Sequence, residues 1–177
     1  MLTLILGGAR SGKSAFAERR ARDVGGDAVL FVATAEAGDE EMRLRIERHR
    51  RSRPAAWHTV EASKGVGAVL QQCGAGARAI IVDCLTLLVA NVLGSWADPW
   101  APEAAEAVRQ EVEALVAAAR ALEAHVFVVS NEVGMGLVPP SPLGRAYRDL
   151  LGEANRRLAA AADEVYLLVA GIPLQVK

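Results

Sequence analysis

The stretch LTLILGGARSGKS, residues 2–14, contains the strongest structural signal in the chain. It opens with a short apolar run that glycines end, as expected for a buried strand of a parallel sheet. Gly7 to Ser14 then match the pattern G-x-x-x-x-G-K-[ST], and residues 13–24 have helical composition up to Gly25 and Gly26. A strand, this loop and a helix in that order predict a phosphate-binding P-loop.

The residue types of this loop explain why the pattern suits phosphate. Glycines let the backbone approach a phosphate group closely and turn its N–H groups toward it. The helix that begins near Lys13 adds the positive end of its dipole. We expect Lys13 to reach the β and γ phosphates of a nucleotide and the Ser14 hydroxyl to bind Mg²⁺.

Apolar runs alternate with helical segments through the rest of the chain. Expected strands are residues 28–33, 57–60, 79–86, 126–132 and 164–171, and expected helices are residues 39–52, 65–73, 85–93, 103–124 and 143–162. Loops are expected at residues 94–102 and 133–142 from their glycines and prolines. Strands that are apolar along their length predict an α/β fold with a mostly parallel sheet and helices on both faces. No long linker divides the chain, so a single domain over residues 1–177 is expected.

The composition limits the classes of function. The chain has 177 residues, 52% hydrophobic and 23% charged, which allows a substantial core. Its net charge of -1 argues against a general nucleic-acid-binding protein. Cys73 and Cys84 lie in apolar segments without metal-ligand spacing and are expected to be reduced core thiols. The first apolar run is too short for a signal peptide or a membrane span, so a cytoplasmic protein is predicted.

A P-loop protein also needs a carboxylate near the phosphates. Asp83, at the end of the predicted strand IIVD, is the first candidate for binding Mg²⁺, and Glu132 is a second. Each of them has an alternative interpretation as a residue that caps a turn at the end of a strand.

Residues 43–53 hold six arginines and His49. These arginines could form a solvated helix face that pairs with Glu40, Glu41 and Glu47, or a nucleic-acid patch, although no aromatic residue interrupts them before Trp57. They could also bind nucleotide phosphates beside the P-loop, neutralising a triphosphate and departing pyrophosphate.

The third alternative gives His49 a chemical role. Surrounding positive charge favours a neutral imidazole, which is a nucleophile, and attack on a phosphorus would give a covalent intermediate. His58 and His125 lack this setting and are expected to be structural.

The segments GGARSGKS, FVATAE, EMRLRIERHR, VDCLT, VVSNEVGMGLVP and RLAAAADEVYLLVAGIP occur in one order along the chain. Over essentially its whole length, the sequence resembles the bifunctional adenosylcobinamide kinase / adenosylcobinamide-phosphate guanylyltransferase family of cobalamin biosynthesis. The resemblance implies a RecA-like P-loop fold and a homotrimer. It also implies phosphorylation of the aminopropanol hydroxyl of adenosylcobinamide by ATP or GTP. Transfer of GMP from GTP through a guanylyl-histidine, with release of pyrophosphate, would follow.

The resemblance also assigns residues. The family histidine falls on His49; some relatives carry two adjacent histidines there, whereas this chain has Arg48 before it. Together with Lys13, His49 is therefore the expected catalytic residue, and Ser14 and Asp83 are expected to bind Mg²⁺. Nucleotide contacts are expected at Gly7, Gly8, Ala9, Arg10, Ser11, Gly12, Lys13, Ser14, Ala33, Thr34, Ala35, Arg50, Arg51, Ser52, Arg53, Glu61 and Asp83.

Other functions remain open from the sequence alone. The main alternative is a P-loop kinase or NTPase that acts on another small molecule without a histidine intermediate. A nucleotide-gated regulatory or RNA-binding protein is a further one. No corrinoid contact can be assigned; Trp96 and Trp100, in a predicted loop, could stack on a flat ring or could be buried.

Overall fold

The computed structural model describes residues 1–177 except residues 37, 39, 41–42, 45–46, 48–49 and 51–52. Its strands are β1 (Leu2–Gly7), β2 (Val29–Ala33), β3 (His58–Glu61), β4 (Ala79–Asp83), β5 (His125–Asn131), β6 (Glu164–Val169) and β7 (Ile172–Gln175). Its helices are α1 (Lys13–Gly25), α3 (Val66–Cys73), α4 (Leu85–Leu93), α5 (Pro102–Ala121) and α6 (Pro142–Ala161). Most of the predicted helix at residues 39–52 lies outside the described residues.

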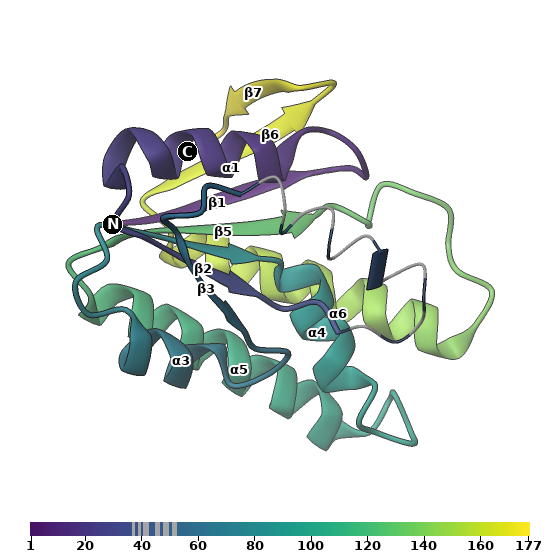
Figure 1. Ribbon diagram of the computed structural model, residues 1–177. Coiled ribbons are helices and arrows are strands. Elements are labelled where there is room, and N and C mark those ends of the chain that lie inside the picture. Colours follow the sequence, from purple (N-terminus) through teal and green to yellow (C-terminus); the bar gives the residue numbers. More distant parts are fainter. Residues whose placement is uncertain (37, 39, 41–42, 45–46, 48–49, 51–52) are drawn as a thin grey trace.

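The strands form one sheet in the order β3-β2-β4-β5-β1-β6-β7. Every neighbouring pair is parallel except β6 and β7, which are antiparallel. The predicted α/β fold with a mostly parallel sheet is therefore confirmed. All parallel strands end at one edge, which we call the carboxyl edge, and begin at the opposite amino edge, near the N-terminus (Figure 1).

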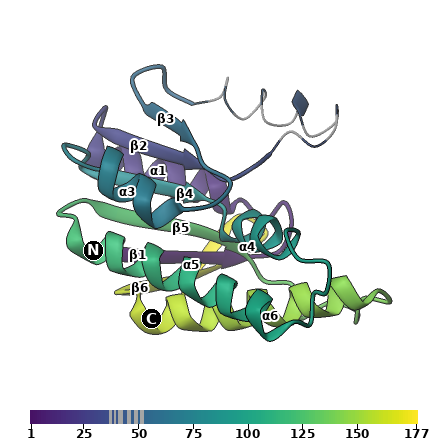
Figure 2. The same ribbon diagram turned by 90° about the horizontal axis from the view of Figure 1, so that it is seen from below.

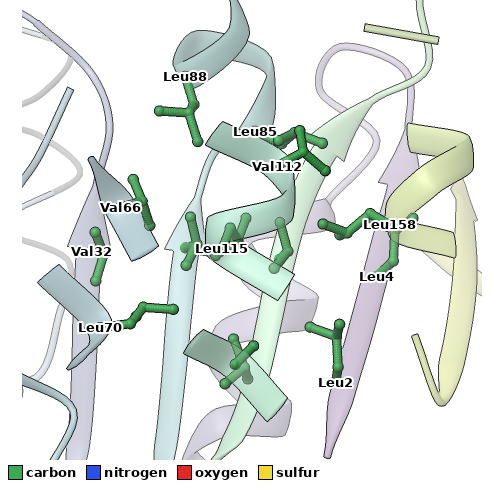
Figure 3. Packing of buried hydrophobic residues seen from close by; sticks show 14 of the residues in the cluster. Leu2, Leu4, Val32, Val66, Leu70, Leu85, Leu88, Val112, Leu115 and Leu158 are labelled. Carbon is green, nitrogen blue, oxygen red and sulfur yellow. The ribbon is translucent and has the colours of Figure 1, made fainter. Parts of the chain in front are cut away.

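Helices cover the two faces of the sheet unequally. Helix α1 lies on one face, and α3, α4, α5 and α6 lie on the other (Figures 1 and 2). Successive strand residues alternate between the faces, so Leu4 packs in the core under α3 to α6 whereas Ile5 packs in the core under α1. Figure 3 shows Leu85, Leu115 and Leu158 meeting strand residues in the larger core. Burying each of these leucines contributes roughly 1.5–3 kcal/mol.

Some predicted boundaries were wrong. The strand expected at residues 79–86 ends at Asp83, because α4 begins at Leu85. The strand expected at residues 164–171 ends at Val169, where Ala170 and Gly171 take positive φ values and turn the chain into β7. All four residues of β7 are exposed, so this edge strand lacks the apolar signal by which buried strands are recognised.

Two further expectations concern exposure. Cys73 and Cys84 are free thiols and half-buried. None of the helices in the described part of the chain is long and apolar enough to cross a membrane.

Candidate functional site

The predicted P-loop connects β1 to α1 at the carboxyl edge. Gly12, just before α1, has a φ of 91°, which favours glycine. A Cβ atom on Gly7 would lie 2.6 Å from both the Leu168 carbonyl oxygen and the Ser11 hydroxyl, so only glycine fits there. The Gly171 N–H donates to the Ser11 carbonyl at 2.9 Å, so the turn between β6 and β7 supports the loop.

The loop contains polar groups that the protein itself satisfies poorly. The Ser11 hydroxyl is buried and has no hydrogen-bond partner within the described residues. Lys13 is only 8% exposed, and its ammonium donates to the Gly8 carbonyl at 2.6 Å. Burial lowers the pKa of Lys13, and the nearby side chains of Cys84 and Asp83 oppose this shift. Because burying a charge without an ionic partner is costly, such a site favours an anion.

Asp83 lies at the end of β4 on the face of the sheet that α1 covers, two residues after Ile81, which packs in the core under α1. Within the described part of the chain, no group of three or more His, Cys, Asp or Glu side chains could hold a metal. Mg²⁺, however, is commonly bound by one or two protein oxygens together with substrate phosphates. The Asp83 carboxylate and the Ser14 hydroxyl, in the first turn of α1, fit that role.

The segment Ala33-Thr34-Ala35 joins the ends of two strands. Thr34 is fully buried; its hydroxyl donates to the Cys84 carbonyl and accepts from the Cys84 N–H, both at 2.7 Å. The Asn91 side chain donates to the Thr34 carbonyl at 2.8 Å. The Thr34 side chain therefore connects the segments after β2 and β4, which leaves the neighbouring Ala33 and Ala35 to approach a ligand.

Glu61 is exposed at the end of β3, beside Ala33 of β2. It lines a hollow of about 410 Å³ together with Ala35, Glu36, Arg43, Glu47, Ala62 and Ser63. A larger hollow, of about 640 Å³, lies at the amino edge and is lined by residues including Met1, Arg78 and His125. That hollow contains no predicted site residue, so its size alone does not make it the functional site.

The arginine-rich segment is described only in part. His49, Arg51 and Ser52 lie outside the described residues, so their expected roles stay predictions. Arg50 is exposed. The guanidinium carbon of Arg53 lies 3.5 Å from the centre of the Phe31 ring.

The surroundings of Arg53 place it at the carboxyl edge. Burial lowers the pKa of its guanidinium, while the nearby charges of Asp83, Glu18 and Glu61 oppose that shift. Its Nε is buried without a hydrogen-bond partner in the described part of the chain. Arg53 therefore brings positive charge close to Asp83.

The other aromatic and histidine candidates also have positions. His125 is buried at the amino edge, 2.8 Å from the Thr3 hydroxyl and stacked on Phe127, in agreement with a structural role. His58 is exposed at the start of β3. Trp96 and Trp100 are 37% and 53% exposed in the loop before α5, so neither is a buried core residue.

A glycine loop between a strand and a helix, a buried lysine and a strand-end aspartate on a parallel sheet define a P-loop nucleotide-binding protein. The fold is similar to that of a solved structure of a protein's ATPase domain, with a TM-score of 0.56 and 18% sequence identity. This similarity covers 95% of the present chain and 69% of that one.

The family model described as cobinamide kinase / cobinamide phosphate guanyltransferase matches residues 3–176, and the chain belongs to this family. It is 44% identical to the bifunctional adenosylcobalamin biosynthesis protein CobU of Salmonella typhimurium, over the full length of both chains. The CobU protein of Escherichia coli is 41% identical, also over both full lengths. The CobP protein of Pseudomonas aeruginosa is 42% identical, over all of this chain and 98% of its own. The family expected from the sequence is thus confirmed.

Proposed function

We propose that the protein phosphorylates adenosylcobinamide with ATP or GTP and then transfers GMP from GTP to the product, giving adenosylcobinamide-GDP and pyrophosphate. The observation that carries this proposal is the family match over residues 3–176, in a chain whose phosphate loop retains every residue of the motif. The proposed place of action is the cytoplasm.

In the kinase step, the aminopropanol hydroxyl oxygen attacks the γ-phosphorus of the bound triphosphate. The bond to the bridging β–γ oxygen breaks, the nucleoside diphosphate leaves, and the hydroxyl proton is released. Lys13 moves from the Gly8 carbonyl to the phosphates and stabilises the charge that develops there. Ser14 and Asp83 hold Mg²⁺, which supplies further positive charge to the phosphate oxygens when bound.

In the guanylyl-transfer step, an imidazole nitrogen of His49 attacks the α-phosphorus of GTP. The bond between the α-phosphorus and the bridging oxygen breaks, and pyrophosphate leaves. The phosphate of adenosylcobinamide phosphate then attacks the same phosphorus and releases His49. Arg50, Arg51, Ser52 and Arg53 bind the phosphates; the position of Arg53 beside Asp83 supports this assignment.

Glu61 is the proposed reader of guanine. A carboxylate can accept hydrogen bonds from both N1–H and the exocyclic amine of guanine, a pair that adenine lacks. Its exposed carboxylate lines the hollow beside β3. Glu61→Gln should therefore weaken GTP binding more than ATP binding in a titration, whereas equal weakening of both would exclude Glu61 as the reader.

The proposed assembly is a homotrimer with a corrinoid and nucleotides as its ligands. Exposed apolar side chains support an assembly of this kind: Ile172 and Leu174 on edge strand β7, and Met135 and Leu137 in the loop after β5. Edge strands and apolar patches of this kind favour contact with another molecule.

The test of the histidine intermediate is incubation with α-labelled GTP, denaturation and peptide mapping. We expect label on His49, stable in base and released by acid as for a phosphoramidate. His49→Ala should lose the label and guanylyl transfer but keep part of the kinase activity, because the loop from Gly7 to Ser14 binds a triphosphate without an imidazole. His58→Ala is the matched control and should label normally.

Two outcomes would contradict this assignment. Undiminished label in the His49→Ala protein, or label on His58, would exclude His49 as the acceptor. An active kinase without label or guanylyl transfer would instead support a P-loop kinase that acts without a histidine intermediate.

A further inference from the structure

Strand β5 ends between the two parts of the P-loop site. In the sheet it lies between β1, which leads into the phosphate loop, and β4, which ends at Asp83. Its last residue, Asn131, is opposite Gly7, and the next N–H, that of Glu132, donates to the Gly7 carbonyl at 3.1 Å. The end of β5 is therefore fixed directly against the start of the phosphate loop.

The alternation along β5 determines which way Asn131 faces. Phe127 and Val129 pack in the core under α1, whereas Val126 and Val128 pack in the core under α3 to α6. Ser130 follows the second set, since its hydroxyl contacts Asn155 of α6. Continued alternation directs the Asn131 side chain to the α1 face, the same face as Asp83.

The backbone of Asn131 is held rigidly from the opposite face. Its N–H donates to the Thr86 hydroxyl at 2.7 Å, and its carbonyl accepts from the Asn155 side chain at 3.0 Å. Asn155 is 5% exposed, and its own carbonyl oxygen accepts from the Ser130 hydroxyl at 2.6 Å. The Tyr147 hydroxyl donates to the Thr86 carbonyl at 3.3 Å.

The side chain of Asn131 contrasts with its backbone. Within the described residues its carboxamide makes no hydrogen bond, although the residue is half-buried. By comparison, the Glu132 carboxylate accepts from the Gly134 N–H at 2.7 Å and is occupied by its own loop. A fixed backbone thus presents a free amide donor between Lys13 and Asp83.

We propose that the Asn131 side-chain amide donates a hydrogen bond to a γ-phosphate oxygen of the bound triphosphate, with Asn155 and Thr86 as its positioning residues. Lys13 and the Mg²⁺ ligand Asp83 mark the β–γ end of the nucleotide, so a donor between them addresses the group that is transferred. This assignment rests on the proposed function only in requiring that a triphosphate binds at the phosphate loop.

The test compares Asn131→Leu, which removes the donor at similar volume, with the wild-type protein. Dissociation constants for a non-hydrolysable GTP analogue and for GDP, both with Mg²⁺, are measured by calorimetry, together with kcat for adenosylcobinamide phosphorylation. The ratio of triphosphate to diphosphate affinity should fall about tenfold or more, as expected for one hydrogen bond to a charged group. The kcat should fall by a similar factor or more, while GDP affinity stays near the wild-type value.

Two further variants guard against a folding defect. Asn131→Ser keeps a polar group that is too short to reach the phosphate and should show the same selective loss at a normal melting temperature. Asn155→Leu should lower the melting temperature by about 2–4 °C per kcal/mol lost and should also reduce kcat, because the strand end loses its anchor.

An unchanged affinity ratio together with an unchanged kcat in Asn131→Leu would overturn the proposal. The result is separable from the proposed function. If the wild-type protein failed to phosphorylate adenosylcobinamide, the affinity ratio would still report whether Asn131 contacts the third phosphate. If phosphorylation were normal and the ratio did not change, only the role of Asn131 would fall.

Discussion

Strands β1 and β5 carry polar residues at both ends, and the two ends differ. At the amino edge, Thr3 and His125 hydrogen-bond each other at 2.8 Å, and Glu164 forms an ion pair with Arg20 at 3.3 Å. The Asp163 carboxylate accepts from the Leu2 N–H at 2.7 Å. Each of these polar side chains therefore has a partner within the chain itself.

The carboxyl edge of the same strands is unsatisfied. The Ser11 hydroxyl has no partner in the described part of the chain, and the Lys13 ammonium contacts only a carbonyl of its own loop. The Asn131 carboxamide makes no hydrogen bond to described residues. Because buried polar groups in folded proteins are normally paired, groups left unpaired at a strand end indicate a ligand. Buried polarity is thus found at both edges, and lack of internal partners distinguishes the functional one.

Lys13→Ala should have the largest effect on this comparison. Removing the ammonium should reduce phosphorylation of adenosylcobinamide by about a hundredfold or more, as for the loss of one preorganised electrostatic donor. The fold should persist, because Lys13 makes one internal hydrogen bond. A kinase assay with circular dichroism as the folding control measures both, and near-native phosphorylation would remove the phosphate loop from the kinase step.

His125→Gln should affect stability at the opposite edge and leave the kinase reaction unchanged at pH 7. Burial, aided by the nearby N-terminal ammonium, lowers the pKa of His125 to about 4. Because the folded pKa lies below the unfolded value of about 6.5, this histidine costs stability as the pH falls from about 6.5 to about 4. The slope from one such proton is at most about 1.4 kcal/mol per pH unit.

Urea unfolding of both proteins between pH 4 and pH 8 measures this difference. The wild-type protein should lose stability toward pH 4 more steeply than His125→Gln. Parallel curves would mean that His125 is not buried in its neutral form.

Arg20→Ala should have the smallest effect. Its ion pair with Glu164 is partly exposed, with side chains 34% and 22% accessible, and such pairs contribute about 0–1 kcal/mol. Thermal unfolding should therefore shift by a few degrees at most, with normal kinase activity. A large loss of activity would show that the amino edge also serves the reaction.

The sequence allowed much of this architecture to be predicted, but not how its parts meet. The motif from Gly7 to Ser14 and the apolar runs identified β1, β2, β4, β5 and β6 because burial leaves a direct signal in sequence. The order of strands leaves no such signal, so the insertion of β5 between β1 and β4 could not be foreseen. The position of Asn131 beside Gly7 follows only from that insertion.

Side-chain partners were equally hidden. Thr34 was expected to contact nucleotide, yet its hydroxyl is engaged by Cys84, which lies 50 positions away in sequence. The packing of Arg53 on Phe31 likewise joins residues from separate segments of the chain. Such contacts depend on the tertiary arrangement of strand ends, which residue types and spacing alone do not encode.

A crystal structure with a non-hydrolysable GTP analogue and Mg²⁺ tests the central claim most directly, because it locates the triphosphate relative to the two edges. The expected result is a triphosphate in the loop from Gly8 to Ser14, with the Lys13 ammonium moved from the Gly8 carbonyl to a phosphate oxygen. The amino edge should keep its contact between Thr3 and His125 and bind nothing. A triphosphate bound in the hollow beside Arg78 and His125, with Lys13 still on the Gly8 carbonyl, would contradict the account.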